Sequence, residues 1–63
     1  MKHKDLKIGQ TVAFTFAGGE LVGVIIDFDK GEKEGVDVSR YMIKDDEGFR
    51  YPIAKEKIIK IIK

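Results

Sequence analysis

The chain has no cysteine and no tryptophan, and it has one histidine and one proline among 63 residues. Without cysteine it can form neither a disulfide framework nor a Cys-based zinc site. The single histidine, His3, lies in a charged N-terminal segment with no obvious carboxylate partners around it. We therefore expect no metal and no cofactor. Apolar packing has to stabilise a chain that is long enough for only one small core.

Groups that usually perform catalysis are equally scarce. The histidine is terminal and Ser39 is the only serine, so a Ser-His-Asp arrangement has no good candidates. Gly18-Gly19 lacks the Gly-Lys-Ser/Thr continuation of a phosphate-binding loop. The acidic run Asp45–Glu47 is typical of a solvated turn. We expect no catalytic residue and a protein that is not an enzyme.

Long apolar runs are also missing. The longest, Leu21–Ile26, is far too short to cross a bilayer, and the first residues are not followed by the apolar stretch of a signal peptide. The sequence therefore predicts a single cytoplasmic domain, residues 1–63, that has no membrane partner.

Charge is nearly balanced overall but unevenly distributed. The net charge is +1, yet residues 27–47 carry four basic and eight acidic side chains, and residues 48–63 carry five basic and one acidic. A general nucleic-acid binder usually has a strong positive excess. At most one local face of this protein is expected to be basic.

Two segments near the N-terminus have the two-residue period of β-strands. In residues 11–16 the alternation places Val12, Phe14 and Phe16 on one face, and Gly18-Gly19 then supplies a hairpin turn. In residues 21–28 the residues predicted to face the core are Val22, Val24, Ile26 and Phe28.

The opposite face of the second predicted strand carries Leu21, Gly23 and Ile25. Gly23 suggests a bend or a close backbone approach. Leu21 and Ile25 give this face more apolar surface than a solvated strand needs. Either a loop or a partner covers it, and a homo-oligomer through the Leu21/Ile25 face is one such partner.

The second half of the chain continues the β pattern. Residues 29–35 are expected to form a mobile charged loop, residues 36–44 a strand with Tyr41 and Ile43 on one face, and Asp45–Gly48 a tight turn. A short strand, residues 49–51, is predicted to end at Pro52. Residues 53–63 fit either a helix or a 3₁₀ turn followed by a last strand, and β-branched isoleucine favours the strand. The predicted fold is all-β, a five-stranded SH3-like barrel with a short 3₁₀ turn before the last strand.

Two resemblances accompany this pattern. The outline Ile8-Gly9-Gln10-Thr11-Val12, then Gly19, then Gly23-Val24 resembles the opening of KOW and Tudor-type modules. Those families bind RNA, ribosomal partners, polymerase or peptide motifs, so the likeness implies a binding role.

The second resemblance covers more of the chain. Ile8-Gly9 with Val12, Gly23 with Ile25, and Tyr51-Pro52-Ile53-Ala54 are similar to the plasmid-type (type II) dihydrofolate reductase, a tetramer of SH3-like barrels with its active site in a central pore. The family's Gln-Ile-Tyr run before the proline matches Phe49, Arg50 and Tyr51. Only the tyrosine is retained, and Phe49 replaces the amide side chain of the family's glutamine.

Two sets of side chains are candidate binding residues. The first combines aromatics and arginines across the Asp45–Gly48 turn, where bases or a peptide can stack; it comprises Arg40, Tyr41, Phe49, Arg50 and Tyr51. The second is a lysine set that Lys4 and Lys7 are expected to approach; it comprises Lys55, Lys57, Lys60 and Lys63.

These observations favour a small non-enzymatic binding or adaptor module whose partner is a protein or a nucleic acid. The alternatives are an oligomeric enzyme like the type II reductase, and an accessory or regulatory protein of a phage or mobile element.

Overall fold

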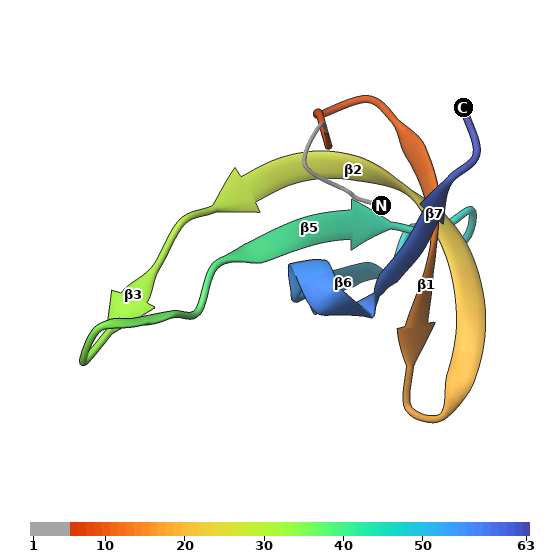
Figure 1. Cartoon of the computed structure of the whole chain (residues 1–63). Helices are drawn as coiled ribbons and strands as arrows, with labels where there is room; N and C mark the ends of the chain where they lie inside the picture. The colour runs from red at the N-terminus through yellow and green to blue at the C-terminus, as the bar shows by residue number, and fades with distance from the viewer. Residues whose placement is uncertain (1–5) are drawn as a thin grey trace.

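A computed structural model describes residues 6–63, and His3 and Lys4 therefore lie outside the described part. Five strands form one antiparallel sheet in the order β6-β5-β2-β1-β7, and a separate two-stranded hairpin projects from it (Figure 1). The elements are β1 (Thr11–Phe16), β2 (Gly19–Asp29), β3 (Glu32–Lys33), β4 (Val36–Asp37), β5 (Arg40–Lys44), β6 (Arg50–Ile53), the 3₁₀ turn η1 (Lys55–Lys57) and β7 (Ile58–Ile61).

The all-β prediction is confirmed, as are the 3₁₀ turn and the last strand; the alternative of a C-terminal helix is wrong. Within residues 6–63 the order of the sheet is open, with β6 and β7 at its edges, so the hydrogen bonding does not close a barrel. Strand β2 pairs with β1 through its first half and with β5 through its second, with a bulge between Ile25 and Asp27. The sheet curves along β2 and folds over its own inner face (Figure 1).

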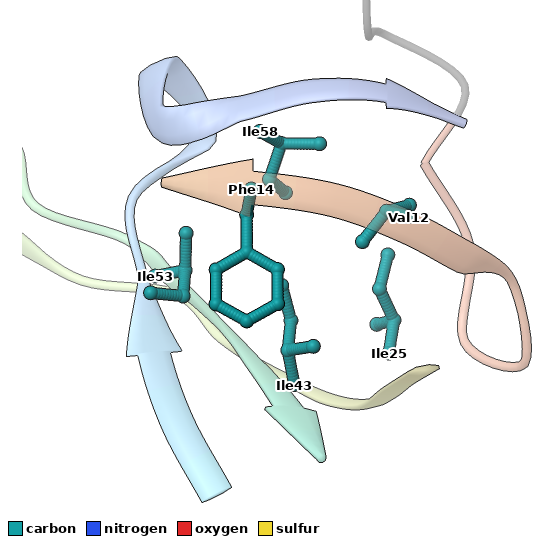
Figure 2. Packing of buried hydrophobic residues seen from close by; sticks show 6 residues of the cluster. All are labelled: Val12, Phe14, Ile25, Ile43, Ile53 and Ile58. Carbon is teal, nitrogen blue, oxygen red and sulfur yellow. The ribbon is translucent and has the colours of Figure 1, made fainter. Parts of the chain in front are cut away.

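The core lies inside this curve. Six fully or almost fully buried side chains, contributed by β1, β2, β5, β6 and β7, converge on one another (Figure 2); they are Val12, Phe14, Ile25, Ile43, Ile53 and Ile58. Apolar burial of this kind is the main favourable term in folding. Each strand contributes only one or two members, so the core depends on all five strands being in register.

The predicted inner face of β2 is wrong before the bulge, whereas Phe28, beyond the bulge, does pair with Tyr41 on the inner side. Ile25 is fully buried, whereas Val22 and Val24 are 50% and 37% exposed. Gly23 gives the physical reason, because a Cβ at this position would lie 2.8 Å from the carbonyl oxygen of Lys44. The side of β2 on which a Cβ of residue 23 would lie is therefore the crowded inner side, and only glycine fits there. Ile25 and the half-buried Leu21 share that side, where Ile25 is part of the core and Leu21 packs against it.

The charged segment after β2 is an ordered hairpin in the structure, not the predicted mobile loop. Lys33 pairs with Val36 across a two-residue turn in which Glu34 and Gly35 both have positive φ. The β1–β2 turn is built in the same way, with positive φ at Ala17 and Gly18 rather than at both glycines. Two residues of positive φ define the type I′ turn, whose twist matches that of paired strands.

Pro52 lies inside β6 and does not end it, because it pairs with Met42 and Ile53 pairs with Tyr41. The N–H of Asp45 donates to the carbonyl of Phe49, and hydrogen-bonded pairs alternate with non-hydrogen-bonded pairs along the ladder from there. The Met42–Pro52 pair is therefore a non-hydrogen-bonded one, and the pairs on either side of it carry the hydrogen bonds. The nitrogen of Pro52 consequently faces the open side of an edge strand, where no donor is needed.

Candidate functional site

Tyr51, one of the predicted binding residues, points to the inner face of the sheet. Its ring centroid lies 5.6 Å from that of Phe14 and 4.8 Å from that of Phe16, with an edge-to-face geometry against Phe16. Its hydroxyl donates a hydrogen bond of 2.9 Å to Oδ2 of Asp45. Tyr51 therefore supports other residues and is not itself a free binding surface.

Asp45 organises the turn between β5 and β6. Its Oδ1 accepts hydrogen bonds from the backbone N–H groups of Glu47 and Phe49, each at 2.9 Å. Partial burial by itself raises the pKa of the carboxyl, but the hydrogen bonds from Tyr51 and the turn outweigh it and lower the pKa from 3.8. Among residues 6–63 no three potential metal ligands cluster, at this turn or elsewhere.

The aromatic and arginine set predicted from sequence is not brought together. Phe49 is 60% exposed in the turn. Arg50 pairs with Lys44, whereas Arg40 lies at the other end of β5. Four residues of antiparallel strand span roughly 13 Å, so the two arginines mark opposite ends of the β5–β6 ladder.

The lysine set is also divided. Lys55 and Lys57 lie on η1, whereas Lys60 pairs with Ala13 on the outer face of the sheet. Lys63 follows β7, and its carbonyl accepts a hydrogen bond from the N–H of Thr11. Lys55 is close enough to Asp37 to contribute to its lowered pKa, although hydrogen bonds from Ser39 are the larger cause.

One pocket does bring predicted residues together. It has a volume of about 200 Å³ and lies between the end of β1, the start of β5 and the β6–η1 segment. Its lining is Thr15, Phe16, Ala17, Arg40, Pro52, Ile53, Ala54 and Lys57. Arg40 and Lys57, which sequence analysis placed in separate sets, thus line the same pocket.

The lining combines an apolar floor with two cations and contains no carboxylate. Phe16 is 44% exposed. The Arg40 guanidinium is held in place by its Nη1, which donates to the carbonyls of Val38 and Ser39 at 3.1 and 3.2 Å. A guanidinium has five donors in a rigid fork, so most remain for a bound carboxylate or phosphate.

Phe16 is the pocket residue that sequence reasoning missed. The alternation of residues 11–16 placed it on one face with Val12 and Phe14, but the core ends before the hairpin and leaves the last aromatic half-covered. Its position beside the Ala17-Gly18 turn was the available signal, because side chains next to a hairpin tip have fewer neighbouring strands to cover them.

Comparisons of this chain with protein-family models, with curated proteins and with solved structures find no match. Within the described residues there is also no helix with the length and apolarity of a membrane span.

Proposed function

We propose that this protein is a small binding module that holds an acidic, partly apolar segment of a partner protein in the pocket between β1 and η1. The observation that carries the proposal is the lining itself. Arg40 and Lys57 line the pocket together with Phe16 and Ile53, and no carboxylate is among the lining residues. Such a site matches a peptide that presents an acidic side chain next to an apolar one.

The arrangement of elements supports an SH3-like barrel as the finer description of the fold. A long bent strand shared by two ladders and a 3₁₀ turn before the last strand both agree with it. In that description the pocket lies next to the 3₁₀ turn. The barrel description would hold even if no peptide bound.

A protein partner has more support than a nucleic acid. Non-specific binding of a single strand requires a continuous basic track with several aromatic platforms. Here Lys60 lies away from the pocket, where it pairs with Ala13 on the outer side of the sheet.

The reductase alternative has less support. It requires the side chains at positions 49–51 to contribute to a shared pore, whereas Phe49 projects from a turn, Arg50 pairs beside Lys44, and Tyr51 is turned inward onto Phe16. No observation on these residues favours a folate or nicotinamide site.

A titration followed by two-dimensional NMR tests the proposal. The probes are an acidic peptide of alternating glutamate and leucine, its glutamine counterpart, and a single-stranded oligonucleotide, each up to about 1 mM, a range that reaches weak complexes. We expect the acidic peptide alone to shift the amides of Phe16, Ala54 and Lys57. The double variant Arg40→Gln/Lys57→Gln should lose this response, and the matched variant Lys60→Gln should keep it.

Two results would overturn the proposal. In one, the oligonucleotide shifts these amides and the acidic peptide does not, which would assign the pocket to nucleic acid. In the other, the double variant binds the acidic peptide as well as the unmodified protein does, so that the two cations play no part in recognition.

A further inference from the structure

The sheet has an outer face that no described residue covers. Residues paired across neighbouring strands share a face. The register therefore places Glu20, Val22, Val24 and Asp27 of β2 on the same side as their neighbours on the other strands, which are Thr11, Ala13 and Thr15 on β1, Met42 and Lys44 on β5, Arg50 and Pro52 on β6, and Lys60 on β7. We call these residues the outer face.

The middle of the outer face is apolar. Val22 and Val24 follow each other on β2 and are 50% and 37% exposed. On an antiparallel sheet with one solvated side, these alternate positions are normally polar. Between them and Lys60 lies Ala13, which is only 1% exposed because its neighbours shield its small side chain.

Charged residues surround this apolar centre in an ordered way. Glu20 and Asp27 lie beyond the two valines at opposite ends, in the direction of β2. Lys44 and Lys60 lie on the strands to either side, in the direction across the sheet. Acidic and basic side chains thus occupy two perpendicular directions on one surface.

We propose that the outer face binds a second copy of this chain, forming a two-fold dimer in which the two sheets cross at nearly a right angle. The two-fold axis lies in the plane of the outer face, halfway between the direction along β2 and the direction across the sheet. Rotation about this axis aligns the strands of one copy with the cross-strand direction of the other. Each acidic residue of one copy then meets a lysine of its partner. Near-perpendicular crossing is one of the two established ways in which sheets pack.

The charge pattern selects a second copy over other occupants. A two-fold contact must be self-complementary, with the same residues on both sides, and the outer face meets this condition in its charges as well as in its apolar centre. Val22, Val24 and both lysines are absent from the pocket lining, so the dimer does not depend on the proposed peptide binding.

Sedimentation equilibrium of the whole chain between about 10 µM and 1 mM tests the dimer, because this range spans weak two-fold contacts. We expect a monomer–dimer equilibrium. The variants Val22→Lys and Val24→Lys should each raise its Kd by about tenfold or more, since both positions lie at the centre of the contact. The matched variant Val36→Lys, at a side chain that is 61% exposed on the hairpin, should leave the Kd unchanged.

Charge reversal distinguishes the proposed perpendicular dimer from non-specific association. Lys44→Glu/Lys60→Glu should abolish the dimer, and adding Glu20→Lys/Asp27→Lys to the same chain should restore it. Circular dichroism of each variant establishes that it is folded. A chain that stays monomeric at 1 mM overturns the proposal, as do a dimer that tolerates Val24→Lys and a fourfold variant that is not restored.

Discussion

The hydroxyl of Tyr51 donates a hydrogen bond to the Asp45 carboxylate at 2.9 Å, while the ring of the same tyrosine packs edge-to-face on Phe16. One side chain therefore links the turn between β5 and β6 to the aromatic floor of the pocket. The hydrogen bond also shifts both titrating groups. It helps to lower the pKa of Asp45, and it is the largest cause of the raised pKa of Tyr51.

Stability is expected to fall at both ends of the pH range. The lowered pKa of Asp45 means that its contribution is present above 3.8 and is lost as the pH falls through the folded-state value. The raised pKa of Tyr51 means that its contribution to stability is present below 10.0 and is lost as the pH rises through the folded-state value.

Urea unfolding from pH 2 to pH 11 measures both losses. Tyr51→Phe should remove the alkaline loss that Tyr51 causes and reduce the acid one. An unaltered alkaline loss in Tyr51→Phe would contradict the assignment.

Gly23→Ala is expected to destabilise the fold. The added Cβ would lie 2.7 Å from Cγ2 of Ile43 and 2.8 Å from the Lys44 carbonyl oxygen. The second of these atoms belongs to the paired backbone and cannot turn away, so we expect a loss of about 1–3 kcal/mol in the free energy of unfolding. Gly19→Ala is the matched control in the same strand, because its Cβ would meet only Phe16 O at 3.8 Å. Equal stability of the two variants in urea unfolding would refute this account of β2.

Glu34→Asn is expected to stabilise the β3–β4 hairpin. Glu34 has φ of 52°, a conformation in which asparagine is much more common than glutamate. Asn-Gly is the favoured pair for the type I′ turn, and we expect a gain of about 0.5 kcal/mol in thermal or urea unfolding. Glu32→Asn removes the same charge two residues earlier, in β3, and serves as the control. If both variants gain equally, charge and not turn conformation is the cause.

Ile43→Ala is expected to unfold much of the population. Ile43 is fully buried where β5 crosses the core, and removing a large aliphatic side chain from such a site costs about 2–5 kcal/mol. A core of this size rarely supplies more than about 3–5 kcal/mol. Circular dichroism at 25 °C should show the loss of β structure. Ile62→Ala, at a side chain that is 47% exposed, should stay folded. A native-like spectrum for Ile43→Ala would show that the core does not depend on this strand.

The strands were predictable because their alternation is local. Thr11–Phe16 and Arg40–Lys44 carry the two-residue period directly, and isoleucine in the last segment favoured a strand over a helix. The inner face of β2 was not predictable from alternation, since both faces are apolar from Leu21 to Ile26. The deciding fact, contact of Gly23 with β5, is a tertiary one.

The hairpin and the pocket show a similar limit. Glu34-Gly35 lacks the asparagine or aspartate that usually signals a type I′ turn. Residues 29–35 were therefore predicted to form a loop and not a hairpin. Arg40 and Lys57 were each candidates, but their shared pocket depends on where β6 and η1 place Ile53 and Ala54. The proximity of residues that are far apart in the sequence could not be predicted from a single sequence.

Pro52 gives the two sides of the sheet different capacities for growth. Strand addition needs a row of outward N–H groups, and the β6 side lacks one where proline stands, whereas the β7 side presents an ordinary backbone. Edge-to-edge addition of a further strand is therefore disfavoured at the β6 border, and the β7 border is the one where the sheet could extend.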